Sequence, residues 1–159
     1  MSDGDPSRSV VVVLTDESVP RVRVPGLASW LQATAPFKAR GIVSLALVED
    51  RTMRRLNRRF AGQDRATDVL SFPAGGPGSP RGAVPFLGDI VVAVGVARRQ
   101  ARLAGHPVGV EIKILALHGL LHLLGHDHHA DGGRMARLEA RLRRKGGLRE
   151  GLIERTRRG

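Results

Sequence analysis

Three histidines that lie close together in the sequence are the residues of this chain best suited to chemistry. His118, His122 and His128 occur in the run LHGLLHLLGHDH, whose spacing is H-x₃-H-x₂-G-x₂-H. Because residues four apart lie on one face of an α-helix, the first two imidazoles can point at the same spot. Gly125 can adopt the left-handed conformation that ends a helix, and a chain that turns back there can bring His128 to the other two.

Three imidazoles around one point are the ligand set of a zinc ion with an open fourth position, as in catalytic zinc sites. A pair of histidines at i and i+4 is a weak signal by itself, because most helical histidines are surface or hydrogen-bonded residues. Here the pair lies in the apolar stretch Ile112 to Leu124, where two imidazoles without a partner would be costly to bury. The spacing therefore predicts zinc on His118, His122 and His128, although nickel or copper fits the same ligands. Asp127 is the candidate general base, or else it orients His128.

The same spacing occurs in zinc peptidases with the motif H-E-x-x-H-x-x-G-x-x-H, and Met135 follows it as their methionine turn would. In those enzymes the glutamate after the first histidine is the general base. This chain has Gly119 at that position, and glycine cannot take up a proton. The substitution argues against a metallopeptidase, which is retained only as a minor alternative.

Composition restricts both the site and the partners. The chain has 159 residues and no cysteine, so it suits one domain and excludes disulfides and thiolate zinc sites. Its net charge is +11, and from residue 134 onward there are ten basic and three acidic residues. A basic surface favours a polyanionic partner, but basic tails are often only solvated, so charge alone leaves a nucleic-acid partner open. The aromatic content of 3% predicts contacts mainly to phosphate rather than to stacked bases.

Hydrophobic patterning predicts four strands and five helices. Strands and helices alternate at first and helices gather at the end, which indicates an α+β fold: a small mixed sheet of about four strands packed with helices, with the zinc-binding helix on one side. We expect a single domain over residues 1–159 with a basic tail from about residue 146. Asp50 and Asp131 are the expected N-caps of their helices, and Gly62 is expected to break the second helix. The expected strands cover residues 9–15, 41–49, 67–72 and 88–94, the expected helices cover 25–35, 50–60, 96–103, 107–124 and 131–145, and 75–82 is a Gly/Pro/Ser-rich loop.

No stretch of the sequence suggests a membrane. Residues 1–9 are polar and lack the apolar core of a signal peptide, and no apolar run reaches the length of a membrane span. We therefore expect a cytoplasmic protein with no membrane partner.

A second unusual run extends from Leu56 to Pro73, where an arginine-rich helix end leads through a glycine turn into a strand. Arg58 and Arg59 in this run are candidates to bind phosphate through paired hydrogen bonds. In the alternative interpretation, Thr67 and Asp68 only bond nearby backbone groups and the arginines face solvent, and spacing alone favours it. Further on, Asp89 either supports a histidine or finishes a turn.

Taken together, these runs resemble the YbeY family of bacterial endoribonucleases, also called rRNA maturation factors. The family signature H-G-x-L-H-L-x-G-Y-D-H matches residues 118–128, except that His126 stands in place of the tyrosine. The family's G-D-I element matches residues 88–90, and the likeness covers nearly the whole chain in order. The family's upstream segment, L-N-x-x-Y-R-x-x-D-x-P-T-D-V-L-S-F-P, matches at Leu56, Asn57, Asp64, Thr67, Asp68 and residues 69–73.

The resemblance implies a single α+β domain in the cytoplasm with one zinc ion on His118, His122 and His128. It implies cleavage of single-stranded RNA, with a role in maturation of the 3′ end of small-subunit (16S) ribosomal RNA and in ribosome quality control. The implied partners are ribosomal RNA and small-subunit ribosomal proteins, and a monomer is expected.

Two residues depart from the family pattern. The family arginine that follows the aromatic residue falls on Ala61, so its role in catalysis or RNA contact cannot be carried over, and Arg58 or Arg59 is the candidate substitute. The family proline is Ala66 here. The missing arginine keeps a further alternative open, a non-catalytic RNA-binding assembly factor stabilised by zinc. Such a factor would bind RNA with a steep salt dependence and would not cleave it.

Overall fold

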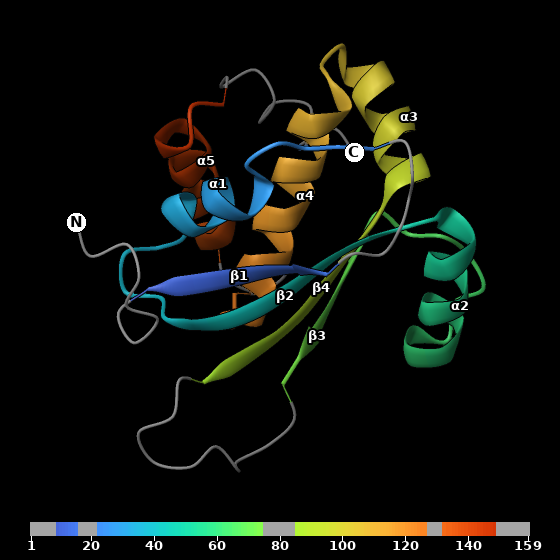
Figure 1. Ribbon diagram of the computed structural model, residues 1–159, viewed down its shortest axis with the longest axis horizontal. Helices are drawn as coiled ribbons and strands as arrows, with labels where there is room; N and C mark the ends of the chain where they lie inside the picture. The colour runs from blue at the N-terminus through green and yellow to red at the C-terminus, as the bar shows by residue number, and fades with distance from the viewer. Residues whose placement is uncertain (1–8, 16–21, 75–84, 127–131, 149–159) are drawn as a thin grey trace.

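The computed structural model describes residues 9–15, 22–74, 85–126 and 132–148 (Figure 1). Within these residues a mixed sheet is packed with helices, which confirms the predicted α+β class and the approximate place of every predicted element. The strands are β1 (Val10–Thr15), β2 (Gly41–Val48), β3 (Val69–Pro73) and β4 (Phe86–Ala93), and the helices are α1 (Leu27–Thr34), α2 (Asp50–Ala61), α3 (Val94–Ala104), α4 (Val108–Leu123) and α5 (Arg134–Lys145).

The sheet has the strand order β1-β2-β4-β3. β1, β2 and β4 are parallel, whereas β3 runs antiparallel to β4 and forms one edge. In the register of the last pair, Ser71 lies opposite Ile90 and Phe72 opposite Asp89. Because β3 is an edge strand, one of its sides is left without a strand partner within the described sheet.

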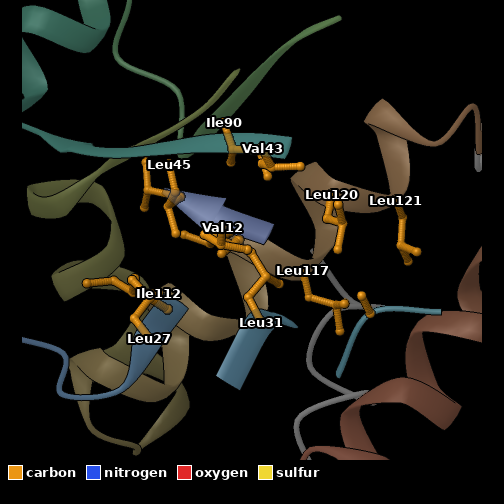
Figure 2. Close-up of a cluster of buried hydrophobic side chains, with 14 of the residues drawn as sticks. Val12, Leu27, Leu31, Val43, Leu45, Ile90, Ile112, Leu117, Leu120 and Leu121 are labelled. Atoms are coloured by element: carbon orange, nitrogen blue, oxygen red, sulfur yellow. The ribbon is translucent and has the colours of Figure 1, made fainter. Parts of the chain in front are cut away.

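Helix α4 is the centre of the main core. It is apolar around most of its circumference, as expected for a helix that is covered on most sides. Ile112, Leu117 and Leu120 of this helix pack with side chains from the sheet and from α1 (Figure 2), and the same cluster includes Met135 and Leu142 of α5. Helix α2 lies at a different face of the sheet, where Met53 packs in a second, smaller cluster with Val48, Val91 and Ala93 (Figure 1). The sheet therefore separates α2 from α4.

The glycine turn predicted after the histidine helix is confirmed. Gly125 has φ 92°, and the N–H groups of Gly125 and His126 donate to the carbonyls of His122 and Leu121 at 3.0 Å each. These two bonds form the Schellman arrangement, which satisfies carbonyls that the end of a helix leaves without partners. The second histidine thus lies in the last turn of α4, at a fixed helix end.

The expected N-caps need correction. The N-cap position of α2 is Glu49, without a side-chain cap bond, and Asp50 is the first helical residue. The Asp50 carboxylate instead accepts hydrogen bonds from the backbone N–H of Val96 and from Arg99, each at 3.1 Å. It therefore caps the N-terminus of α3, because donors there lack partners in their own helix. Asp131 lies outside the described residues, and Gly133 is the N-cap of α5.

No helix in the described parts of the chain is both long enough and apolar enough to span a bilayer. The Gly/Pro/Ser-rich loop at 75–82 and residues 149–159 of the predicted basic tail lie outside the described residues.

Candidate functional site

A cavity of about 780 Å³ lies along one face of α4. Its walls come from the edge strand β3, from α3, from α4 itself and from α5. Glu111, His118 and His122 lie along the α4 wall, so the cavity follows this helix for about 16 Å at 1.5 Å per residue. It therefore has two ends, a histidine end near the end of α4 and an acidic end near its start.

The histidine end brings two predicted ligands together. His118 Nε2 and His122 Nε2 are 3.1 Å apart, and the two rings meet edge to face. Two nitrogens that share one zinc ion at about 2.0–2.1 Å in tetrahedral geometry are about 3.3 Å apart. The two imidazoles thus fit one metal ion, as their i and i+4 spacing predicts.

The third predicted ligand, His128, and its neighbour Asp127 lie outside the described residues. Among the residues that the structure does describe, no group of three His, Cys, Asp or Glu side chains is arranged to hold a metal. A metal at the histidine pair thus needs a further ligand from outside the described part, and His128 stays the predicted one.

Behind the histidine pair lies a carboxylate that sequence reasoning missed. Glu139, on α5, has Oε1 at 3.1 Å from His118 Nδ1 and at 3.4 Å from Arg143 Nη2. A carboxylate that accepts the Nδ1–H leaves the Nε2 lone pair for a metal and fixes the ring orientation. Burial by itself raises the pKa of Glu139, but the hydrogen bond from His118 and the positive charge of Arg143 outweigh burial and lower it.

A signal for Glu139 and Arg143 is visible in the sequence in retrospect. Met135 and Leu142, which are buried, mark the inward face of α5, and both charged residues fall on that same face. Arg143 is 1% exposed. Charged residues within the apolar stripe of an amphipathic helix indicate a buried polar contact, because such charges are kept only when they are paired.

Gly119 is the reason why α4 can approach the sheet this closely. A Cβ at this position would lie 2.7 Å from Ile90 Cγ2 and 3.1 Å from Ser71 Oγ. The Ser71 hydroxyl donates to the Gly119 carbonyl at 2.9 Å. No larger residue fits without displacing the sheet, so the position that holds the general-base glutamate in peptidases serves packing in this chain.

The acidic end of the cavity contains two further carboxylates. Glu111 is 1% exposed, and its Oε1 lies 2.8 Å from His106 Nε2. Asp68 Oδ1 accepts the N–H of Val69 at 2.8 Å, and its Oδ2 accepts from Gln100 at 3.3 Å. The interpretation of Asp68 as a local backbone partner is therefore confirmed in part, since the residue also binds α3. Both carboxylates thus have hydrogen-bonding partners within the protein.

Arg58, Arg59 and Asp89 are not brought to the histidines. Arg58 and Arg59 are exposed near the end of α2 and do not line the cavity. Asp89 lies on the sheet face turned away from α4, because its strand neighbours Gly88 and Ile90 face that helix. None of these three residues lines the cavity, so the structure gives no support for a direct role in chemistry at the histidines.

Known proteins match most of this chain. The family model described as "Endoribonuclease YbeY" matches residues 24–145. A protein of that name from Solibacter usitatus is 59% identical over 67% of this chain and 67% of its own length. Another from Anaeromyxobacter sp. is 50% identical over 76% of this chain, although the match spans only 62% of that protein. One from Thermus thermophilus is 44% identical over 77% of this chain and 88% of its own length.

A solved structure has a similar fold. The solution structure of TM1509 from Thermotoga maritima superposes with a TM-score of 0.57 at 24% sequence identity. The match covers 86% of this chain and 88% of that protein. At this identity the likeness concerns the fold.

Proposed function

The chain belongs to the YbeY family, and on this basis we propose that it is a zinc-dependent endoribonuclease that cleaves single-stranded RNA. Its proposed substrate is the 3′ region of small-subunit (16S) ribosomal RNA. We propose that the protein also acts in ribosome quality control. The observation that carries the proposal is the pair of Nε2 atoms 3.1 Å apart on His118 and His122. Both residues line a cavity, and His118 has a carboxylate behind it, which is how catalytic zinc ligands are usually supported.

In the proposed site, His118 and His122 hold the zinc ion together with His128. When bound, zinc supplies the Lewis acidity that stabilises charge developing on a phosphate. Glu139 holds the His118 ring so that Nε2 points into the cavity. The apolar side chains of Ile114 and Leu115 line the wall between the two ends and reduce water there, which strengthens electrostatic interactions at the histidines.

The remaining catalytic roles are proposals on the sequence alone. Asp127 is the proposed general base because it directly precedes His128. The family arginine is replaced by Ala61, so no cation at that position neutralises the phosphate. We propose ribosomal RNA and small-subunit ribosomal proteins as partners of a monomer in the cytoplasm.

One observation favours the second candidate, a zinc-stabilised RNA-binding assembly factor that does not cleave. Among the described residues that line the cavity, the only Lys or Arg is Arg143, which is 1% exposed and bonded to Glu139. A scissile phosphate at the histidines therefore meets no exposed cationic side chain from the described wall. Metal or residues outside the described part must supply that charge if the protein is a nuclease.

Cleavage of a labelled small-subunit rRNA 3′ fragment by zinc-loaded protein tests both candidates. We expect His118→Ala to lose zinc and cleavage together, whereas the matched control His126→Ala, which removes an imidazole close to the ligand pair, keeps both. Equal cleavage by wild type and His118→Ala would contradict the nuclease proposal. RNA binding without cleavage by wild type would favour the assembly factor.

A second variant tests the support of the ligand. We expect Glu139→Gln to weaken zinc binding by about 10–100-fold, because outer-sphere partners of ligating histidines have effects of this size. Competition with a chelator measures the affinity without any need for activity. Glu111→Gln at the acidic end is the control, and an equal loss there would show that Glu139 has no special role.

A further inference from the structure

The exposed side of α2 has a concentration of positive charge that the cavity does not use. Five arginines lie on this helix of 12 residues, and an exposed phenylalanine lies near its end. We propose that Arg55, Arg58, Arg59 and Phe60, which we call the α2 arginine surface, dock the single-stranded RNA that leaves the cavity. The inference rests on the proposed function, since the ligand is the same RNA.

The spacing of the arginines is unfavourable for the helix itself. Arg51 and Arg55, Arg54 and Arg58, and Arg55 and Arg59 are like-charged pairs at i and i+4, which destabilise a helix. The helix dipole favours cations in the last turn, which accounts for Arg58 and Arg59. It does not account for the arginines in the first half of α2. A polyanionic ligand relieves the repulsion among all of them.

Only part of this charge is neutralised within the protein. Arg51 pairs with Glu49 at 3.3 Å and Arg54 pairs with Asp64 at 2.8 Å. Within the described residues, Arg55, Arg58 and Arg59 have no carboxylate within ion-pair distance. These three arginines are exposed, so their guanidinium groups can reach a phosphate backbone without breaking an internal ion pair.

Phe60 adds a feature that plain solvation of a charged helix does not explain. Its side chain is 59% exposed, and the Arg59 guanidinium carbon lies 5.3 Å from the ring centroid. Single exposed apolar residues are common and need no explanation. An exposed aromatic ring beside a guanidinium is, however, a combination by which proteins bind single strands, since a base can stack on the ring while a phosphate meets the cation.

The position of Phe60 connects the surface to the cavity. Its ring meets Phe72 of β3 edge to face at 5.3 Å between centroids. The strand neighbours of Phe72, Ser71 and Pro73, line the cavity on the other face of β3, because successive side chains alternate. Ser71 bonds Gly119, the residue after His118, so Phe60 and Phe72 lie behind the histidine end.

β3 is the edge of the sheet, which allows a strand of RNA to pass around it. In Figure 1, α2 stands beside the sheet on the side away from α4, and the contact between Phe60 and Phe72 joins its last turn to β3. An RNA strand whose phosphate lies at the histidines can therefore turn around this edge and continue over α2.

The test measures binding of a 12-nucleotide single-stranded RNA by fluorescence anisotropy over a series of salt concentrations. The variant Arg55→Gln/Arg58→Gln/Arg59→Gln removes three charges and keeps good helix formers. The matched control, Arg134→Gln/Arg137→Gln/Arg141→Gln, removes three charges from exposed positions on α5. A gel after each titration confirms that the RNA is intact.

We expect the α2 variant to lower the slope of log Kd against log salt by about 2, at about 0.7 per phosphate contact on single strands. The control should keep the wild-type slope. Phe60→Leu, which keeps an apolar contact with Phe72, should weaken binding on the order of tenfold with little change in slope. An unchanged slope for the α2 variant, or an equal loss in the control, overturns the proposal.

Two further outcomes separate this inference from its alternatives. If the α2 variant loses poly-glutamate binding as strongly as RNA binding, and Phe60→Leu binds RNA normally, the surface serves an acidic protein and the RNA proposal is wrong. If wild type binds RNA through α2 and does not cleave it, the nuclease proposal fails and the docking surface stands. If wild type cleaves RNA and the α2 variant keeps the wild-type slope, the nuclease proposal stands and the docking surface fails.

Discussion

Arginine has opposite surroundings in two regions of this molecule. Arg143, beside the histidine end of the cavity, is 1% exposed, and its Nη2 lies 3.4 Å from Glu139. On α2, by contrast, Arg55, Arg58 and Arg59 are exposed and have no carboxylate partner among the described residues. The buried arginine fixes the position of Glu139 beside His118, whereas the exposed arginines place positive charge in contact with solvent.

The difference shows what each region can contribute to binding RNA. A buried guanidinium cannot reach a phosphate without leaving its carboxylate, so Arg143 acts on the site through Glu139 and His118. The exposed arginines of α2 can bind phosphate but are separated from the histidines by the sheet. The different roles of these arginines therefore follow from their burial or exposure, since the residue type is the same.

The largest expected effect is at Arg143. Arg143→Met leaves the Glu139 carboxylate buried with fewer partners, and the loss of one member of a buried pair costs about 3–5 kcal/mol. We expect the lower end of this range, since Glu139 keeps its bond to His118 and its side chain is 12% exposed. Urea unfolding of the zinc-free protein measures the change without a contribution from metal binding.

The matched variant on α2 is Arg58→Met, which we expect to change stability by no more than about 0.5 kcal/mol. The double variant Arg143→Met/Glu139→Met should recover much of the loss, because an apolar pair replaces a desolvated ionic one. If Arg143→Met and Arg58→Met lowered the free energy of unfolding equally, Arg143 would have no structural role that the α2 arginines lack.

The histidine end could be predicted only in part from the sequence. The spacing of His118 and His122 implies their shared helix face, and Gly125 marks the turn, because both features depend on local backbone geometry. Glu139 was missed because its contact with His118 depends on how α5 packs against α4. The place of Glu139 on the apolar face of α5 indicates a buried polar contact, but local spacing does not show that the partner is His118. The role of His128 stays a prediction.

Gly119 provides the second test of the histidine end. Gly119→Ala should destabilise the protein by about 1–3 kcal/mol through overpacking, although alanine is the better helix former. Its Cβ would lie 2.7 Å from Ile90 Cγ2. The control on the same helix is Gly109→Ala, where the nearest atom is Val24 Cγ1 at 3.6 Å. We expect that variant to gain up to about 1 kcal/mol. Equal effects of the two changes in urea unfolding would show that α4 does not pack tightly on the sheet.

The sequence around α2 predicted where the helix ends but did not predict which side chains of α2 contact other elements. Gly62 ends the helix as expected, with φ 69°. Asp50 looks like the cap of its own helix, because an aspartate at a helix start usually caps it. Its bonds to Val96 and Arg99 arise from the packing of α2 beside α3, which brings together residues 46 positions apart or more. The like-charged spacing of the exposed arginines indicates a polyanionic ligand but does not identify it.

The smallest expected effect belongs to the exposed ion pair next to α2. The hydrogen bond from Arg54 lowers the pKa of Asp64 below its ordinary value of 3.8, and the charges of Arg54 and Arg58 act in the same direction. A carboxyl group with a lowered pKa in the folded state stabilises the protein above its unfolded pKa. That stabilisation is lost as the pH falls through the folded pKa.

We therefore expect Asp64→Asn to lower the Tm slightly near neutral pH, since exposed pairs contribute little and are screened by salt. The difference from wild type should shrink as the pH falls through the lowered pKa of Asp64, and it should shrink at high salt as well. Thermal unfolding over a pH series measures both trends. A difference that grows in acid would mean that protonation of Asp64 stabilises the folded protein, and the pKa of this carboxyl would then be raised by its surroundings instead of lowered by the arginines of α2.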